Sequence, residues 1–300
     1  RRACLHQPRG GPGGLASALN DPEIQQRFLR ILSGIRQPAR LIGEEPGSGA
    51  GFADDPDGLR VVLAFPDTYE IGISNQAIQI LYHIAGGLHG VAVERTYLPW
   101  VDVSSEMRRA GVPLLTLETW SPVGSADLLG ITLQHEFDYT NVLELLDLAG
   151  IPLHASDRTE AHPLVVVGGP ACADFLPLVK FLDAVAVGDG EELFAEILQV
   201  LVKAKADGVS RAATRERLSR LEGVYVPGIS RGVTRRVIGS LSDAPYPAAC
   251  LVPLTAGVHD RAWIEVMRGC TRGCRFCQAG MWYRPVRERT PDEVMKMAAA

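Results

Sequence analysis

The sequence predicts an α/β fold built around a doubly wound parallel β-sheet. Five short and nearly continuous apolar runs lie between residues 59 and 188, and segments with helical character separate them. Strands of this kind are buried on both faces, which is the arrangement of a parallel sheet covered by helices. The chain has 300 residues, of which 46% are hydrophobic, so it can bury a substantial core in about two domains.

Strands and helices alternate regularly along this part of the chain. The expected strands are residues 59–65, 91–98, 127–134, 163–169 and 184–188. The expected helices are residues 75–84, 104–110, 139–148, 176–181 and 191–206. Together they define a flavodoxin-like domain over residues 58–206, and such sheets bind ligands at the carboxyl ends of their strands.

Three further segments complete the expected organisation. Residues 1–57 form an N-terminal extension with a helix over 22–32, and we expect its basic, Gly/Pro-rich start, Arg1–Gly14, to be disordered. Residues 207–260 form a linker with a few strands. Residues 261–300 begin a second domain, in which a strand at 262–267 leads into a cysteine loop and a helix starts at Pro291 with Thr290 as its N-cap.

Charge and cysteine usage indicate the compartment. The formal net charge is −5, so the overall charge supports neither a nucleic-acid partner nor a polybasic membrane anchor. The sequence contains no run of eighteen apolar residues, so it predicts no transmembrane helix. Arg1–Gly14 also lacks the apolar segment that a secretory signal contains. Three of the six cysteines fall within eight residues, which makes a poor disulfide framework. We therefore expect a cytoplasmic protein with reduced thiols.

The cysteine loop carries the strongest chemical signal. Cys270, Cys274 and Cys277 follow the spacing Cys-x3-Cys-x2-Cys, and Gly269 and Gly273 allow the backbone to wrap around a cluster. Ferredoxin-type spacings supply four thiolates, whereas no fourth cysteine is near this loop, so one iron would stay open to an outside ligand.

A zinc site is the alternative for these thiols. It would need a fourth ligand, which Cys250 or His259 could supply.

The spacing, together with the aromatic Phe276 just before the third cysteine, resembles the radical S-adenosylmethionine (SAM) superfamily. The resemblance implies that Cys270, Cys274 and Cys277 hold a 4Fe–4S cluster whose open iron chelates SAM. One electron from the cluster then cleaves SAM reductively to a 5′-deoxyadenosyl radical, and a reductant such as flavodoxin or ferredoxin supplies that electron. It also implies that residues 261–300 are the truncated start of a partial (β/α)6 TIM-type barrel.

Arginines crowd the same region, and two interpretations stay open. The six are Arg268, Arg272, Arg275, Arg284, Arg287 and Arg289. They could face an anionic cluster, a SAM carboxylate or an RNA phosphate. Equally, they could form a solvated face with salt bridges to the first domain.

The first domain resembles cobalamin-binding domains. There the first strand ends in Asp-x-His-x-x-Gly, and the His ligates cobalt; here Asp67 and Gly72 keep the frame, but Tyr69 replaces the His. The other positions that the resemblance assigns to cofactor binding are Thr132, Gly168, Gly169, Gly188 and Gly190. The alternative is that these glycines only make tight strand-to-helix turns in a cobalamin-like scaffold. His135 is a further candidate for the pocket.

Over residues 22–300 the motifs together resemble an uncharacterised bacterial family of radical SAM proteins with a cobalamin-binding-like N-terminal domain. With cobalamin, the expected reaction is methyl transfer to an unreactive carbon or phosphorus. The alternatives are a cobalamin-independent radical modification of RNA or protein, and a non-catalytic metal-binding scaffold. The resemblance supplies no substrate. Since the family's barrel and SAM motifs extend beyond residue 300, we expect this chain alone to be inactive.

Overall fold

The computed structural model describes residues 21–49, 51–53, 58–242, 244–247, 250–258, 261 and 263–299. Two of the sequence expectations, disorder of Arg1–Gly14 and a ligand role for His259, concern residues outside these ranges.

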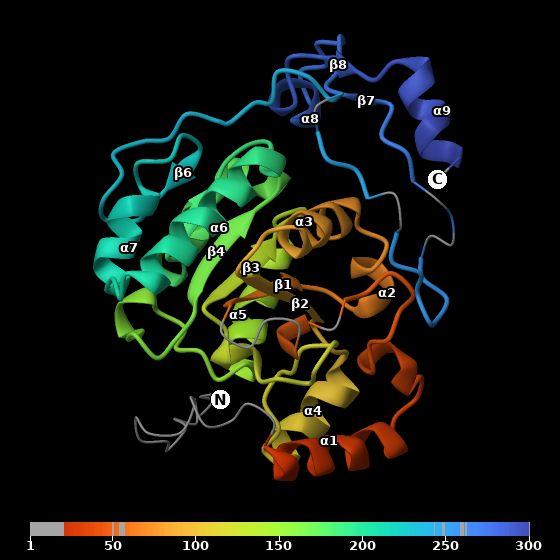
Figure 1. Ribbon diagram of the computed structural model, residues 1–300, viewed down its shortest axis with the longest axis vertical. Coiled ribbons are helices and arrows are strands. Elements are labelled where there is room, and N and C mark those ends of the chain that lie inside the picture. Colours follow the sequence, from red (N-terminus) through yellow and green to blue (C-terminus); the bar gives the residue numbers. More distant parts are fainter. Residues whose placement is uncertain are drawn as a thin grey trace.

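The core of the structure is a mostly parallel six-stranded sheet (Figure 1). Its strands are β1 (Leu59–Phe65), β2 (Val91–Tyr97), β3 (Leu128–Thr132), β4 (Leu164–Gly168), β5 (Ala184–Ala186) and β6 (Val224–Tyr225). The order is β2-β1-β3-β4-β5-β6, and only β6 runs antiparallel to its neighbour. The first five strands therefore follow the 2-1-3-4-5 order of flavodoxin-like sheets, in which the strand order reverses between β1 and β3. The expected parallel sheet is confirmed.

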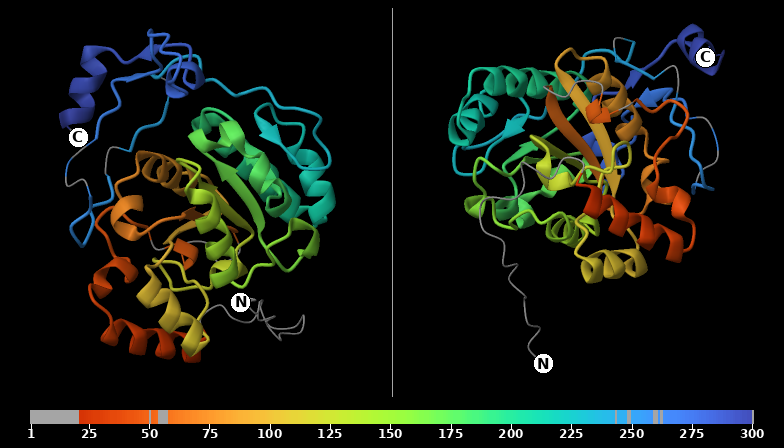
Figure 2. Two further views of the ribbon diagram at one scale, coloured as in Figure 1. Left: turned by 180° about the vertical axis from the view of Figure 1, so that it is seen from behind. Right: turned by 60° about the horizontal axis from the view of Figure 1, so that its bottom comes forward.

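Helices cover both faces of this sheet, as Figures 1 and 2 show. The α-helices of this part are α1 (Pro22–Gly34), α2 (Tyr69–Gly72), α3 (Gln76–Gly86), α4 (Val101–Ala110), α5 (Asp138–Leu148), α6 (Gly190–Ala206) and α7 (Arg211–Leu218). Short 3-10 helices occupy Pro38–Leu41, Gly51–Ala53, Val123–Ser125, Ala155–Asp157, Pro170–Asp174 and Leu176–Phe181. One apolar core lies under α1, α4 and α5, and a second lies under α3 and α6.

Local sequence explains how several helices begin and end. Asn75 begins α3, and its side-chain oxygen accepts a hydrogen bond from the backbone N–H of Ile78 at 3.2 Å. Gly111 ends α4 in the left-handed conformation that favours glycine. The expected helix at 176–181 is present as a 3-10 helix, with Pro177 in its first turn.

Two sequence expectations need correction. The expected linker, residues 207–260, begins with α7, and it also supplies β6, so the sheet continues past residue 206. Ser210 caps α7 through a hydrogen bond from Ala213 N, and this short polar helix has too little apolar periodicity to stand out in the sequence. The expected strand at 262–267 is shorter, because only Met267 and Arg268 pair with another strand.

The C-terminal part is a small unit at the top of Figure 1. It consists of β7 (Met267–Arg268), α8 (Ala279–Trp282), β8 (Arg287–Glu288) and α9 (Pro291–Ala299). β7 and β8 form an antiparallel two-stranded ribbon that flanks the cysteine loop. The expected start of α9 is confirmed: Thr290 Oγ1 accepts from Glu293 N at 3.3 Å, and the Glu293 carboxylate accepts from Thr290 N at 2.7 Å.

Candidate functional site

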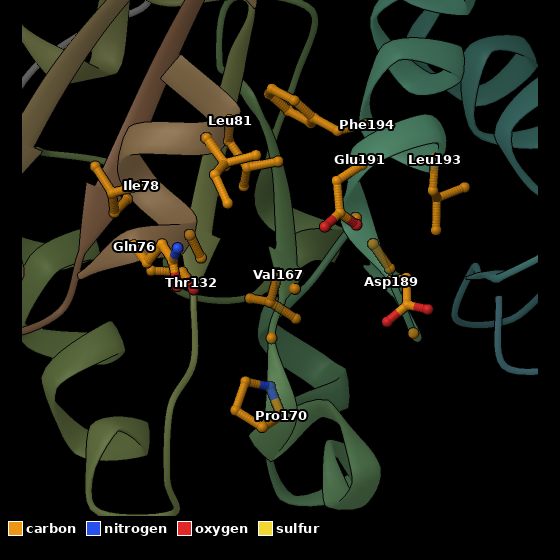
Figure 3. Close-up of a pocket in the computed structure, with 18 of the residues that line it drawn as sticks. Gln76, Ile78, Leu81, Thr132, Val167, Pro170, Asp189, Glu191, Leu193 and Phe194 are labelled. Carbon is orange, nitrogen blue, oxygen red and sulfur yellow. The ribbon is translucent and has the colours of Figure 1, made fainter. Parts of the chain in front are cut away.

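A cavity of about 440 Å³ lies between α3 and α6, above the sheet and at the carboxyl ends of β3, β4 and β5. Figure 3 shows Ile78 and Leu81 of α3 on one side and Leu193 and Phe194 of α6 on the other. Its inner walls are apolar, while Gln76, Thr132, Gln134, Asp189 and Glu191 supply polar groups. A concave apolar site with few polar groups, at the carboxyl edge of a doubly wound sheet, is the usual form of a cofactor site.

Five of the residues that the sequence assigned to cofactor binding line this cavity together. They are Thr132, Gly168, Gly169, Gly188 and Gly190. Each follows or ends a strand of the parallel sheet or starts the next helix, so the sheet topology brings them to one edge. Their convergence agrees with a cofactor site, although their individual roles stay a prediction.

Two of the glycines are also required by the backbone. Gly169 has φ +109°, and a Cβ there would lie 2.4 Å from Leu133 O. Gly188 has φ +119°, and a Cβ there would lie 2.1 Å from Arg236 O. The tight-turn interpretation therefore holds for these two positions. Gly168 differs, because a Cβ at this position would have only ordinary contacts, at 3.8 Å from Ala186.

The first-strand motif does not reach the cavity. The lining includes none of Asp67, Tyr69 and Gly72. Asp67 Oδ1 instead accepts from Thr68 N at 2.7 Å, and Tyr69 is only 2% exposed, buried in the core. A Cβ on Gly72 would lie 2.3 Å from the ring of Tyr97, so this glycine makes room for an aromatic side chain.

The cavity excludes His135, which the sequence suggested, and includes Gln76 and Gln134, which it did not. His135 does not line the cavity; its Nδ1 lies 3.3 Å from Asp138 Oδ1, and its ring packs against Phe137. Gln76 and Gln134 do line it, and Gln76 Nε2 is buried without a hydrogen-bond partner. Gln134 closely follows the end of β3 and Gln76 starts α3, but glutamine forms no motif by itself.

The cysteine loop lies beside the mouth of the cavity, since Met267, Arg268 and Gly269, which lead into the loop, form part of the lining. Gly269 has φ +99°, and a Cβ there would lie 2.7 Å from Tyr283 O, so the expected need for glycine is confirmed. Gly273 has no such restraint, because its nearest neighbour, Arg284 Nη2, would be 4.0 Å from a Cβ. A role for Gly273 in wrapping the loop around a cluster stays a prediction.

The three thiols suit an iron–sulfur cluster by their chemistry. The sulfur of Cys270 accepts from Arg272 N and the sulfur of Cys277 accepts from Gly280 N, both at 3.4 Å, while Cys274 is exposed. Soft thiolates with backbone N–H donors are the ligands that such clusters use. Within the described part of the chain, no three His, Cys, Asp or Glu side chains are gathered closely enough to hold a metal ion. The ligand set therefore fits by type and spacing, and its closure around a cluster stays a prediction.

Other sequence candidates near the loop take different places. Phe276 is 93% exposed, and Cys250 lines a second cavity of about 280 Å³ that also includes Tyr246 and Trp263. The role of Cys250 as a fourth zinc ligand, like that of His259, stays a prediction. The exposed Phe276 is free to contact a further segment or ligand.

Two of the arginines pair with the first domain. Arg268 Nη2 lies 2.6 Å from Glu191 Oε1, and Arg268 Nη1 lies 2.9 Å from Asp189 Oδ1. The guanidinium of Arg287 also pairs with Asp189. Burial alone would raise the pKa of Asp189, but the hydrogen bond from Arg287 and the charge of Arg268 lower it below its usual value. The salt-bridge interpretation of these two arginines is confirmed, whereas Asp189 and Glu191 as their partners were missed.

No helix in the described ranges is long and apolar enough to cross a membrane.

Comparisons with known proteins place the chain in a family. The model of the family "Radical SAM proteins, N-terminal" matches residues 77–227, from α3 to β6, and the match ends before the cysteine loop. The uncharacterized protein MJ0966 of Methanocaldococcus jannaschii is 25% identical over 241 residues, which are 79% of this chain and 45% of that protein.

Among solved structures, the radical S-adenosylmethionine methyltransferase TsrM of Kitasatospora setae, with tryptophan and a SAM analogue bound, is similar at 15% identity. The TM-score is 0.45, over 79% of this chain and 44% of that one. The chain thus spans less than half the length of either relative. Because the family match covers half of its residues, the chain belongs to the radical SAM proteins, whose N-terminal region it contains.

Proposed function

We propose that this chain is the cofactor-binding part of a radical SAM enzyme. In this proposal, Cys270, Cys274 and Cys277 hold a 4Fe–4S cluster, and the cavity between α3 and α6 holds cobalamin. The observation that carries it is the composition of the cavity wall. That wall combines strand-end glycines of the sheet with Met267–Gly269, the residues that lead into the cysteine loop.

The cluster part rests on the ligand set. Three thiols on one short loop leave one iron without a protein ligand, as chelation of SAM by its amino and carboxylate groups requires. When bound, such a cluster supplies the electron that cleaves SAM. The chain itself supplies the soft ligands, and the N–H groups of Arg272 and Gly280 that point at two of the sulfurs stabilise negative charge there.

The cobalamin part rests on shape and lining. A cavity of about 440 Å³ with apolar walls suits the flat apolar base of a nucleotide tail, and strand-end glycines let a chain of polar atoms approach the backbone. Tyr69 is buried in the core, so this position offers no ligand to a metal in the cavity. A corrin in this site would therefore be held through its tail and periphery.

The activity follows from the two cofactors together. Methyl transfer to an unreactive carbon or phosphorus is the reaction that fits both, with flavodoxin or ferredoxin as the electron donor. Radical modification of RNA or protein without cobalamin is the function that remains if the cavity takes no corrin. A cytoplasmic setting suits the reduced thiols that a cluster requires.

Anaerobic reconstitution with iron and sulfide tests the cluster. We expect visible absorption typical of a 4Fe–4S cluster and an EPR signal on reduction. Cys270→Ala, Cys274→Ala and Cys277→Ala should each lose it, while Cys250→Ala, which removes an exposed thiol elsewhere, should keep it. One zinc per chain without iron, or a cluster that survives Cys274→Ala, would contradict the proposal.

Hydroxocobalamin retention tests the cavity. The chain should carry cobalamin through gel filtration, and the absorption spectrum of the eluted protein measures the amount. If the wild-type chain carries none, the cobalamin-independent function replaces the proposed one.

A further inference from the structure

Arg268 and Arg287 stand opposite each other on the ribbon that flanks the cysteine loop, because they pair in the register of β7 and β8. Both guanidinium groups reach the beginning of α6. Arg268 contacts Glu191 at 2.6 Å and Asp189 at 2.9 Å, and Arg287 contacts Asp189. Glu265, three residues before Arg268, forms a further ion pair with it, at 2.9 Å between Glu265 Oε1 and Arg268 Nε.

The carboxylate side of this cluster is rigid. Asp189 and Glu191 are 5% and 6% exposed, and they stand at the start of a 17-residue helix packed on the sheet. Asp189 Oδ2 also accepts from Ile238 N at 3.0 Å, which ties a third segment to the same carboxylate. Figure 3 shows both carboxylates at the start of α6, next to the cavity.

The loop side has further contacts of its own: Arg287 Nη1 donates to Ile238 O at 3.0 Å, and Arg289 Nη1 donates to Leu241 O at 2.5 Å. β7 and β8 contain two residues each, and an isolated two-stranded ribbon is at best marginally stable in water. Met267, Phe276 and Met281 are 43%, 93% and 48% exposed, so these large apolar residues of the ribbon and loop are not anchored in a core. Trp282 packs against the apolar core, and Arg235 is stacked over its ring at 5.6 Å.

The ion pairs therefore tie the ribbon, and with it the cysteine loop, to the start of α6. Arg268 is two residues before Cys270, and Arg268, Asp189 and Glu191 all line the cavity. We infer that Asp189 and Glu191 are positioning residues that fix the cysteine loop at the mouth of the cavity. A ligand in the cavity and a group held by the cysteines are then neighbours. The inference rests on the proposed function only in taking the loop as the cluster site.

Hydrogen–deuterium exchange of the 300-residue chain without cofactors tests the positioning directly. Glu191→Gln removes one charge from the cluster, and Asp189→Asn removes the other. We expect amides within residues 267–289 to exchange about tenfold faster or more in either variant, while peptides of β1, β3 and β4 keep wild-type rates. The control is Glu192→Gln, whose side chain is 55% exposed and pairs with Arg236 instead.

A charge-reversed double variant distinguishes loss of the ion pair from failure to fold. In Glu191→Arg combined with Arg268→Glu, the pair is restored in reverse, and exchange of 267–289 should return toward the wild-type rate. Equal ribbon exchange in wild type, Glu191→Gln and Asp189→Asn would overturn the inference. Faster exchange of the whole sheet in both single variants would also overturn it, because the carboxylates would then serve general stability.

A cofactor-loaded measurement supplies the functional readout. In wild type carrying a reduced cluster and cob(II)alamin, the two paramagnets should broaden each other's EPR signals, and Glu191→Gln should reduce this broadening at equal cofactor content. Unchanged broadening would overturn the inference. If wild type takes up neither cofactor, the proposed function fails, and the exchange experiment still decides whether Asp189 and Glu191 position the loop.

Discussion

The ring of Tyr69 lies edge-on against the ring of Tyr97, with centroids 5.3 Å apart and planes at 77°. Both rings are buried, at 2% and 3% exposure. Burial and the nearby carboxylate of Glu45 raise the pKa of Tyr69 well above its usual value, so the phenol stays neutral. The residue in the place of a cobalt-ligating histidine is thus an aromatic residue of α2 that packs against the end of β2.

Gly72 makes this aromatic pair possible, and we predict that Gly72→Ala destabilises the fold. The added Cβ would lie 2.3 Å from the ring of Tyr97, which must shift within a packed core. We expect a loss of about 1–3 kcal/mol in the free energy of unfolding, measured by urea denaturation. Gly34→Ala at the end of α1 is the control, because nothing lies within 4 Å of its Cβ. Unchanged stability of Gly72→Ala together with lost cobalamin retention would instead assign Gly72 to the cofactor.

The sheet and its edge were predictable from sequence because the signals are local. β1, β3, β4 and β5 are short, mostly apolar runs, and the parallel topology then brings Thr132, Gly168 and Gly188 to one edge without further information. The spacing of Cys270, Cys274 and Cys277 is equally local.

What the sequence could not provide depends on contacts between distant segments. The pairing of Arg268 with Glu191 joins residues 77 positions apart, and nothing in either motif specifies the other. Tyr69 turned out buried because Tyr97 and Glu45, on other segments, enclose it. Helix α7 was missed because its eight residues carry only two buried side chains, Thr214 and Leu218.

A bulky side chain in the cavity should block its ligand without unfolding the protein. Ala77 of α3 lines the cavity and is only partly buried, so we predict that Ala77→Phe folds but retains hydroxocobalamin at least about tenfold more weakly. Equilibrium dialysis measures the affinity. Ala206→Phe, at the exposed far end of α6, is the matched control and should bind as wild type does. Equal binding by both variants would place the corrin outside this cavity.

Glu94 predicts a pH dependence of stability. Its side chain is fully buried in β2, and burial raises its pKa to about 7, although Phe52 N donates to it at 2.6 Å. The folded state therefore holds this proton more tightly than the unfolded chain, whose carboxyl has a pKa near 4.5. The contribution of Glu94 to the free energy of unfolding should be greatest below pH 4.5. It should fall by roughly 3 kcal/mol as the pH rises to about 7.

Glu94→Gln isolates this effect from other titrating groups. Urea denaturation from pH 4.5 to 8 measures the unfolding free energy of wild type and of Glu94→Gln. As the pH rises, wild type should lose stability relative to Glu94→Gln. The amide keeps the shape of the side chain and cannot lose a proton. If the unfolding free energies of the two proteins stay parallel over this pH range, Glu94 is ionised in the folded state throughout.

Asp183 should be a costly carboxylate to neutralise. It is 1% exposed, and its Oδ2 accepts from Val165 N at 2.9 Å, from Arg158 at 2.8 Å and from Arg211 at 2.6 Å. Asp183→Asn leaves the fully buried guanidinium of Arg158 without its counter-charge, so we expect a loss of about 3–5 kcal/mol in urea denaturation.

The surface pair of Asp207 and Arg217, at 3.3 Å, provides the contrast. Asp207→Asn should cost less than about 1 kcal/mol, since water screens exposed charges. Asp183 precedes β5 and lies at the amino ends of β4 and β5, opposite the edge that carries the cavity. Asp183→Asn protein that remains folded should therefore keep wild-type cobalamin retention. Weaker retention at full folding would mean that strain at the amino edge is transmitted through β4 and β5 to the site.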